Sequence, residues 1–278
     1  MSSRFSRTRS GQPGRVCTSF FRQCDCRLLN CLLFCGAKAN FQNISVQLSF
    51  ASYNIRKAIG LDRRRDPDRI LSILREIDAD VVALQEADRR FGRRETVLPL
   101  AAIHEHTPYF PVPLAMRPDS IGWHGNALLV RRGIELADAS VVPLPTLEPR
   151  GAVRADLIAQ GQRIRVVGMH LDLSGLRRRH QIRSVLDHVA DCDGDWPTVL
   201  MGDFNEWARQ AGCFREFGKG WQVLAPGRSF PSRRPVAQLD RIIVSAEWSI
   251  AGTYVHHSAL SAKGSDHLPV RAHLELRK

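Results

Sequence analysis

The chain has 278 residues, 44% of them hydrophobic, which is enough for one large α/β domain or two small ones. No run of about 18 apolar residues occurs, so the sequence predicts no transmembrane helix. The formal net charge is +12, but residues 1–45 carry half of it. The rest of the chain is only mildly basic, and its charge alone is weak evidence for nucleic acid binding.

Residues 1–45 differ in composition from the rest of the chain. They hold five of the seven cysteines, in a spacing that matches no common zinc site. Arg27–Ala39 has a short apolar run with an Ala-x-Ala-like end, but the basic leader before it is long for a signal peptide. We predict that 1–45 is a disordered leader or an upstream start assigned in error. We expect one cytoplasmic domain over 46–278, with export as the alternative, because the two body cysteines suit a reducing compartment.

The first predicted strand, Val46–Tyr53, alternates apolar and small polar residues and ends at Asn54. Asp66, followed by proline, predicts the start of a helix, and apolar residues at helical spacing come next. Val81–Leu84 has the pattern of a buried strand, and Glu86 lies just past its end. A strand, a helix and a second strand would bring Asn54 and Glu86 to the same edge of a sheet. The alternative for Glu86 is a solvated loop acid.

The middle of the chain is predicted to contain a helix, three strands and a second helix, in this order: Val97–His106, Asn126–Val130, Ala152–Ala159, Arg163–Leu171 and Ser174 to about Asp191. Gln160–Gln162 is typical of a hairpin turn between the second and third of these strands. His170 lies at the end of the third strand, where a histidine can be structural or catalytic. The arginines of the second helix (177, 178, 179 and 183) are predicted to form a solvated face.

A buried strand over Thr198–Met201 is followed by Gly-Asp-Phe-Asn at 202–205. This order places a carboxylate, Asp203, and an amide, Asn205, at the carboxyl edge of a sheet. Side chains two apart on an extended chain face the same way, so both would enter one small site. The alternative is an Asx-turn that only caps a loop.

The C-terminal part is predicted to contain a helix, a loop rich in Pro, Arg and Ser, and three strands, in this order: Ala208–Phe217, Pro226–Pro235, Leu239–Val244, Trp248–His256 and Val270–Leu276. Asp240 lies near the start of the first of these strands. Asp266 and His267 come just before the last one. Elements alternate over 46–276 with no linker, which favours a single domain.

Nine polar residues lie at turn or strand-end positions: Asn54, Glu86, Asn126, His170, Asp203, Asn205, Asp240, Asp266 and His267. Carboxylates and amides of this kind suit Mg²⁺ or Mn²⁺. Two histidines that can each meet a carboxylate suit proton transfer near neutral pH. No nucleophile elbow, Walker loop or dinucleotide fingerprint occurs, so hydrolysis by metal-activated water is the natural chemistry.

An ordered set of short motifs resembles that of the endonuclease/exonuclease/phosphatase superfamily: Tyr-Asn-Ile, Leu-Gln-Glu, Gly-Asn-Ala, His170, Gly-Asp-Phe-Asn, Leu-Asp-Arg-Ile and Ser-Asp-His-Leu-Pro. This superfamily includes DNase I, exonuclease III-like AP endonucleases, neutral sphingomyelinases and inositol-polyphosphate 5-phosphatases. The resemblance covers about residues 46–276. It implies a DNase I-like, four-layer α/β sandwich of two packed mixed β-sheets flanked by helices, with the site at one edge.

The resemblance also implies a metal site. Glu86 resembles the main Mg²⁺ ligand, with Asn54 beside it and Asp266 as a second carboxylate on the metal side. Asn126 and Arg150 are expected to bind the substrate phosphate, and the alternative for Arg150 is an arginine at a strand edge.

Five further residues match catalytic positions of the family. Asp203 resembles the residue that orients or deprotonates the attacking water, and Asn205 the amide that holds a phosphate oxygen. His267 would contact the phosphate, held in its tautomer by Asp240. His170 matches the histidine of DNase- and sphingomyelinase-type members that can protonate the leaving oxygen.

The sequence departs from the AP endonucleases at two places. Arg56 stands where they carry an acid, and His170 stands in a part of the site where they use a tyrosine. The opening motif looks closer to compact bacterial members and to lipid-directed relatives, including the branch that remodels GPI lipids.

The expected function is a Mg²⁺-dependent phosphodiesterase with nucleic acid as the first substrate. A phospholipid headgroup, as in sphingomyelinases or GPI-lipid remodelling, is the alternative, and a degenerate module that only binds phosphate or nucleic acid is a third. A basic cleft would favour nucleic acid. An exposed apolar rim near Trp123 and Trp207 would favour lipid. No obligate protein partner is expected.

Overall fold

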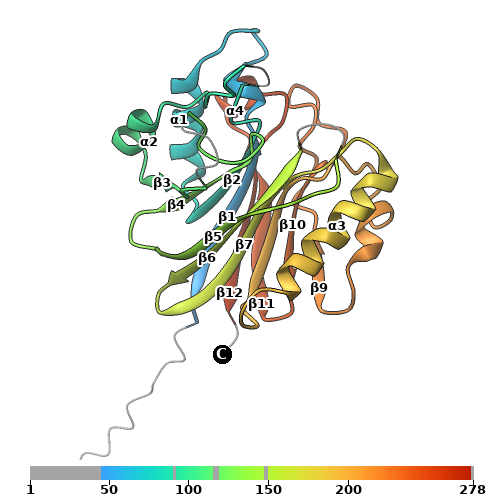
Figure 1. Ribbon diagram of the computed structural model, residues 1–278. Helices are drawn as coiled ribbons and strands as arrows, with labels where there is room; N and C mark the ends of the chain where they lie inside the picture. Colours follow the sequence, from blue (N-terminus) through green and yellow to red (C-terminus); the bar gives the residue numbers. More distant parts are fainter. Residues whose placement is uncertain (1–44, 90–91, 115–118, 147–149, 277–278) are drawn as a thin grey trace, which may run out of the picture. The chain divides into compact units, whose positions relative to one another are not determined.

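The computed structural model describes residues 45–89, 92–114, 119–146 and 150–276. In this part of the chain two mixed six-stranded sheets pack face to face, and helices cover their outer faces (Figure 1). The predicted four-layer α/β sandwich is therefore confirmed. The predicted leader lies outside the described residues except for Ser45, so its state stays a prediction. No helix in the described ranges is long and apolar enough to cross a membrane.

Sheet 1 has the strand order β11–β12–β1–β2–β4–β3. Its strands are β1 (Gln47–Asn54), β2 (Val81–Gln85), β3 (Tyr109–Pro111), β4 (Ala127–Arg131), β11 (Trp248–Val255) and β12 (Val270–Leu276). Only β1 and β2 pair in parallel, and α1 (Pro67–Ile77) connects them. The predicted start of this helix is confirmed, because the Asp66 carboxylate accepts a hydrogen bond from the Arg69 amide at 3.0 Å.

Sheet 2 has the strand order β5–β6–β7–β8–β10–β9. Its strands are β5 (Glu135–Val142), β6 (Gly151–Ala159), β7 (Gln162–His170), β8 (Thr198–Asp203), β9 (Trp221–Leu224) and β10 (Asp240–Ser245). Here β7 and β8 are the parallel pair, joined by α3 (Gly175–Ala190). The predicted hairpin turn joins β6 and β7, with Gln160 and Gly161 both at positive φ, as the favoured two-residue turn requires.

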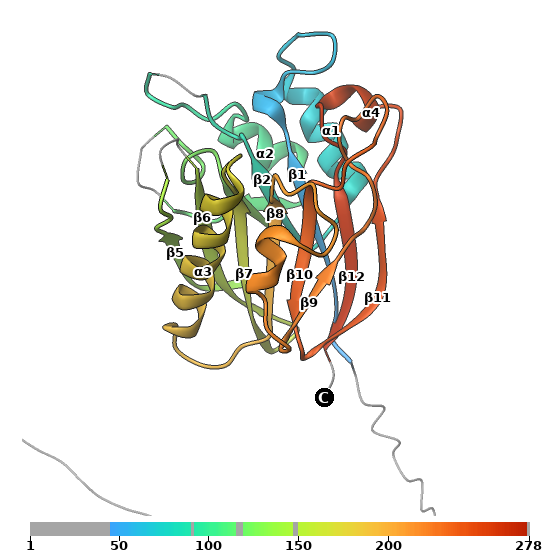
Figure 2. The ribbon, with the colours of Figure 1, turned by 90° about the vertical axis from the view of Figure 1, so that its right-hand side faces the viewer.

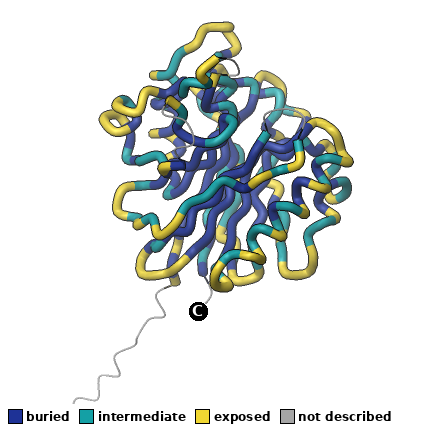
Figure 3. The backbone as a smooth tube through the Cα atoms, in the orientation of Figure 1, coloured by how far each residue is buried: buried dark blue, intermediate teal, exposed yellow. Residues whose placement is uncertain are grey.

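Three apolar layers hold the sandwich together. The middle layer lies between the sheets and includes Phe50, Met201 and Trp248. A second layer packs sheet 1 against α1 and α2 (Leu100–His106), and a third packs sheet 2 against α3. Figure 2 shows α3 on one side of the domain, and Figure 3 shows that the strands are buried while loops carry most of the exposure. This burial fixes strand register, since a slip of one residue would exchange the side chains that face the other sheet with those that face the helices.

Two predicted helices are shorter than expected. The first begins at Leu100 rather than Val97, because Asp88 bridges Thr96 and the Val97 amide donates to the Ala87 carbonyl. The second, predicted over Ala208–Phe217, is only a 3-10 turn at Gly212–Glu216. The helix starting after Ser174 is where the sequence predicts it, although the Ser174 side chain makes no capping hydrogen bond.

Other predictions need smaller corrections. Arg178 is not on a solvated face: it is buried and pairs with Glu206 at 3.1 Å. Strands β3, β5 and β9 were not predicted. They are three of the four edge strands of the two sheets, and none of them has the continuous apolar pattern of a buried strand. The short helix α4 (Ser261–Gly264) precedes the Asp266 turn.

Candidate active site

Strand register places three polar side chains level with one another on adjacent strands of sheet 2. His170 on β7 pairs with Asp203 on β8, and Asp203 pairs in turn with Asp240 on β10. Residues directly opposite each other on neighbouring strands project from the same face of a sheet. All three are buried. One edge of sheet 2 therefore offers an imidazole and two carboxylates side by side.

Sheet 1 contributes Asn54 and Glu86 from the ends of its parallel strands. Asn54 pairs with Gln85, and Glu86 follows at once with φ of 55°. The three residues after Ile55 (Arg56, Lys57 and Ala58) also have positive φ. Non-glycine residues in this region cost roughly 1–2 kcal/mol each, and such strain is typical of functional sites.

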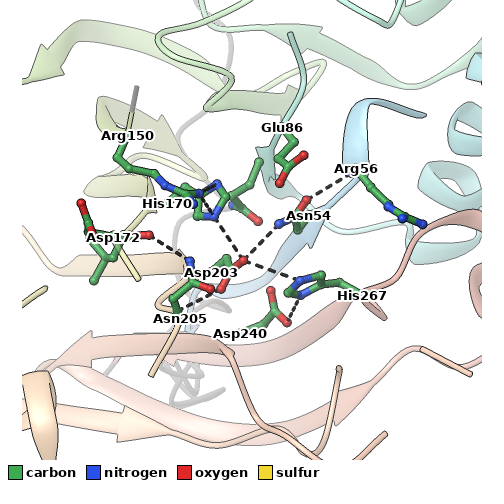
Figure 4. A network of polar contacts seen from close by, with 12 residues as sticks. Asn54, Arg56, Glu86, Arg150, His170, Asp172, Asp203, Asn205, Asp240 and His267 are labelled. Carbon is green, nitrogen blue, oxygen red and sulfur yellow. Dashed lines mark hydrogen bonds and ion pairs between the residues drawn. The ribbon is translucent and has the colours of Figure 1, made fainter. Parts of the chain in front are cut away.

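Asp203 lies at the centre of the site (Figure 4). Its Oδ2 accepts a hydrogen bond from Asn54 Nδ2 at 3.0 Å and lies 3.3 Å from His170 Nε2 and 3.7 Å from His267 Nε2. Its Oδ1 accepts from the Asn205 amide at 3.0 Å. The Gly-Asp-Phe-Asn stretch thus forms the Asx-turn through Asp203 Oδ1, while Oδ2 faces Asn54 and the two histidines.

His267 lies between two carboxylates. Its Nδ1 is 2.9 Å from Asp240 Oδ2, which also accepts a hydrogen bond from the Ser229 hydroxyl. Burial alone would lower the pKa of His267, but the charges of Asp240 and Asp203 outweigh burial and raise the pKa to about 10. The ring is therefore protonated at neutral pH and can present a positive charge to a phosphate.

His170 has the opposite electrostatic setting. The Arg150 guanidinium lies against its ring, with Nη1 3.0 Å from Nδ1. Burial is the main cause that lowers the pKa of His170, to about 3; Asp203 opposes this shift and Arg150 reinforces it. The ring is neutral near pH 7 in the free protein, which does not suit the expected role as a proton donor.

The structure gives the two site amides local partners. Asn205 has φ of 49°, and its Nδ2 donates to the Leu171 carbonyl at 2.9 Å, so it ties β8 to the segment after β7. Asn126 is buried and donates to the Trp123 carbonyl at 3.2 Å. Its Oδ1 is buried with no partner among the described residues. An unpartnered buried oxygen of this kind is costly unless a ligand or water satisfies it.

The predicted metal ligands Glu86 and Asp266 face cationic side chains. Lys57 Nζ contacts Glu86 Oε2, and Arg56 Nε lies 3.2 Å from Asp266 Oδ2. These contacts show that both carboxylates attract positive charge at the mouth of the site. Carboxylates with an adjacent amide are also the donor set that Mg²⁺ or Mn²⁺ prefers, so the residues fit such an ion.

A second group could also hold a metal ion. One ligand atom from each of Asp203, Asp240 and His267 lies within 4.8 Å of the other two. A histidine nitrogen must be deprotonated to bind a metal, however, and both nitrogens of His267 face carboxylates. This arrangement favours a hydrogen-bonded array at these three residues. Glu86 and Asp266 then remain as the predicted ligands of the ion.

Sequence reasoning missed three residues that shape the site. Lys57 reaches Glu86, Ser229 orients Asp240, and the Phe230 ring packs on His267 with 4.8 Å between ring centroids. Lys57 lies two residues after the Tyr-Asn-Ile motif, and this closeness is a signal that could have identified it. Ser229 and Phe230 lie in a loop whose sequence has no recognisable motif, and only the folded structure brings them to His267.

The fold and the site together define a class of protein. Two packed mixed sheets with acids, amides and histidines at one edge are the architecture of the DNase I-like hydrolases. The chain matches the Endonuclease/Exonuclease/phosphatase family over residues 51–267. The protein therefore belongs to that family, and the resemblance stated from its motifs is confirmed.

Similar proteins extend this comparison. The "Uncharacterized protein YbhP" of Escherichia coli strain K12 is 28% identical over 258 residues, covering 83% of this chain and 98% of the relative. Among solved structures, a functionally unknown conserved protein from Enterococcus faecalis V583 has a TM-score of 0.66 and 20% identity, covering 83% of this chain and all of that one. TDP2 of D. rerio, complexed with a single-strand DNA product, has a TM-score of 0.64 and 18% identity, covering 82% and 98%. These structural likenesses support the fold.

Proposed function

We propose that the protein is a phosphodiesterase that depends on Mg²⁺ or Mn²⁺. The observation that carries this proposal is the position of Asp203, whose Oδ2 is surrounded by Asn54, His170 and His267. The serine hydroxyls nearest the site are already committed as donors: Ser229 to Asp240, and Ser265 to the Asn54 carbonyl at 2.7 Å. Water is therefore the natural nucleophile.

Each site residue has a role in this reaction. A bound divalent ion, held by Glu86 with Asn54 and Asp266, would polarise the phosphate and favour ionisation of a nearby water. Asp203 orients that water and accepts its proton. The water oxygen bonds to phosphorus, the bond from phosphorus to the leaving oxygen breaks, and the leaving oxygen takes up a proton. Protonated His267 stabilises the charge that grows on the phosphate oxygens.

His170 and Arg150 act on the same phosphate from the β7 side. Arg150 supplies a guanidinium that can pair with a phosphate oxygen, and neutral His170 can donate one hydrogen bond. A bound phosphate would bring negative charge next to His170 and raise its pKa, which would bring it closer to the proton-donor role that the sequence suggested.

Two substrate classes remain. Nucleic acid is the first expectation from the sequence, and exposed arginines beside the site support it. A phospholipid headgroup is favoured by a different observation: Trp207 is exposed next to the site, as the apolar-rim criterion requires, whereas Trp123 is only partly exposed. Binding without cleavage is the remaining alternative, although all of the expected polar positions are filled.

A substrate panel tests the proposal. Plasmid, abasic oligonucleotide, sphingomyelin, cardiolipin and bis-p-nitrophenyl phosphate would each be assayed with Mg²⁺ and with EDTA. We expect turnover that EDTA abolishes and that Mg²⁺ or Mn²⁺ restores. Asp203→Asn, which keeps the size of the side chain, should remove turnover in every arm. Full activity in EDTA, or full activity of the Asn variant, would contradict the mechanism.

A further inference from the structure

Four large apolar side chains are exposed beside the site. Leu173 and Leu176 are 67% and 65% exposed, Trp207 is 66% exposed and Val236 is 57% exposed. They come from three segments that connect strands of sheet 2: the start of α3, the turn after β8, and the loop between β9 and β10. Single exposed apolar residues are ordinary on protein surfaces, but a group of them rarely is.

Hydrogen bonds, an ion pair and a ring contact link these segments into one surface. Arg178 bonds the Leu173 carbonyl at 2.6 Å and Glu206 Oε2 at 3.1 Å, which brings the start of α3 against the residue before Trp207. The Trp207 ring packs edge-on against Phe230, with 6.4 Å between centroids. Val236 belongs to the same loop as Phe230 and is held close to it, because the Val236 amide donates to the Phe230 carbonyl at 2.9 Å.

The same segments carry site residues. Leu173 lies three residues after His170, and Trp207 lies two residues after Asn205. Phe230 packs directly on the His267 ring. The apolar side chains therefore border the place where the phosphate would react. We call Leu173, Leu176, Trp207 and Val236 the apolar rim.

Among charged residues, the three segments that carry the apolar rim hold basic ones only, and the acids next to them in sequence, Asp172 and Glu206, are buried. The segments 173–177, 207–210 and 228–238 contain no acidic residue and five arginines: Arg177, Arg209, Arg228, Arg233 and Arg234. Within the described part of the chain none of these guanidiniums has an ion-pair partner. Apolar side chains ringed by unpaired cations complement a surface that is apolar inside and anionic outside.

We propose that the apolar rim and its arginines dock the protein on an anionic phospholipid bilayer. This inference rests on the proposed phosphodiesterase function, and it names the substrate class as a phospholipid in a membrane. An exposed tryptophan could instead stack on the bases of single-stranded nucleic acid. Three of the four rim side chains are aliphatic, however, and aliphatic chains enter a bilayer but make poor stacking platforms. The bilayer therefore fits better.

Vesicle flotation in EDTA tests the docking surface apart from catalysis. The full chain would be mixed with vesicles of phosphatidylcholine alone or with added phosphatidylglycerol. We expect binding to the anionic vesicles, weakened by added salt. Leu173→Ser with Leu176→Ser should lower the partition coefficient about tenfold or more, and Val236→Ser should lower it less. Leu100→Ser with Ile250→Ser, a matched pair of exposed apolar residues on α2 and β11, should leave it unchanged.

A fluorescence measurement gives a second readout. Brominated lipids should quench the tryptophan emission of the wild-type protein. Trp207→Phe should remove the part of this quenching that comes from Trp207. The proposal is overturned if the wild-type protein does not bind anionic vesicles, or if the two double variants bind them equally well. It is also overturned if the rim variants keep vesicle binding and lose binding to single-stranded DNA. Hydrolysis of bis-p-nitrophenyl phosphate is scored separately with Mg²⁺, and we expect it to persist in the rim variants. Its absence from the wild-type protein would reject the proposed function instead.

Discussion

Asp240 and His267 are the residues whose pairing has the clearest chemical consequence. Asp240→Asn keeps the shape of the side chain but removes the charge that holds the His267 ring protonated. We expect the fold to persist and kcat to fall roughly 10² to 10⁴-fold, because acid–base and electrostatic contributions have this size. Measuring kcat and melting temperature on the most active substrate checks this.

The double variant decides whether the two residues act as a unit. Asp240→Asn with His267→Ala should be little worse than His267→Ala alone, since residues that work together are not additive. Multiplicative losses in kcat would show that they act separately. A lower melting temperature with nearly unchanged kcat would show that Asp240 only supports its strand.

We expect Lys57 to compete with a bound divalent ion for Glu86, the predicted metal ligand. Lys57→Met removes the ammonium group that contacts Glu86 Oε2 and leaves the carboxylate free. The contact is partly exposed, so we expect a modest gain, with Mn²⁺ binding about three- to tenfold more tightly in a calorimetric titration. Lys219→Met removes an exposed lysine from a loop away from the site and serves as the control. Unchanged or weaker Mn²⁺ binding in the Lys57 variant would argue that Lys57 does not oppose the ion.

The sequence predicted the positions of most site residues but not their electrostatics. Strand-end patterns located Asn54, Asp203 and Asp240, because period and turn chemistry are local properties. The low pKa of His170 was not predictable, since it depends on burial and on Arg150 arriving from another segment. The position of Lys57 close to the Tyr-Asn-Ile motif was visible in the sequence, but its contact with Glu86 was not, because that contact depends on a left-handed backbone at Lys57.

At the level of elements, one buried ion pair holds the start of α3 to the segment after β8. Glu206 accepts from Arg178 and from the amides of Ala208 and Cys213, which closes 206–213 into a loop. Glu206→Gln removes the negative charge and leaves the buried Arg178 guanidinium without its counter-ion. We expect a loss of about 2 to 4 kcal/mol in the free energy of unfolding, measured by chemical denaturation. Asp187→Asn changes an exposed residue of the same helix that has no ion-pair partner among the described residues, and it is the control.

The same ion pair predicts how stability depends on pH. Burial would raise the pKa of Glu206, but the hydrogen bonds from Ala208, Cys213 and Arg178 together lower it. A carboxylate with a lowered pKa stabilises the fold above its unfolded pKa, and the contribution disappears as the pH falls through its folded pKa. The difference in stability between wild type and Glu206→Gln should therefore shrink in acid. A constant difference across that range would contradict this account.

The loop at 206–213 also explains why a predicted helix is absent. Residues 208–217 have acceptable helix propensity, but Gly212 has φ of 62° and the Glu206 carboxylate takes two amides of the segment. Tertiary contacts thus override local preference. The buried strands were predictable because burial on both faces leaves a continuous apolar run. The edge strand β5 was not, since its exposed face interrupts that pattern.

At the level of the whole molecule, the described residues begin at Ser45, just before the first strand, β1. A protein that starts at Val46 should keep its melting temperature and its activity, because Val46 is already buried and its carbonyl accepts from the Leu276 amide at 2.9 Å. Thermal denaturation and the phosphodiesterase assay check this against the full chain. Failure to fold would show that residues 1–45 belong to the domain.

The position of β12 has a consequence for biosynthesis. This last strand lies between β11 and β1, in antiparallel register from Gln47 with Glu275 to Ser52 with Val270. While the chain is being made, β1 emerges first and must wait for a partner strand far downstream, since Glu275 comes 228 residues after Gln47. Its unpaired edge is open to association with other chains during that interval. His267 also lies in this downstream part, so under the proposed mechanism a nascent chain should stay inactive until His267 has emerged.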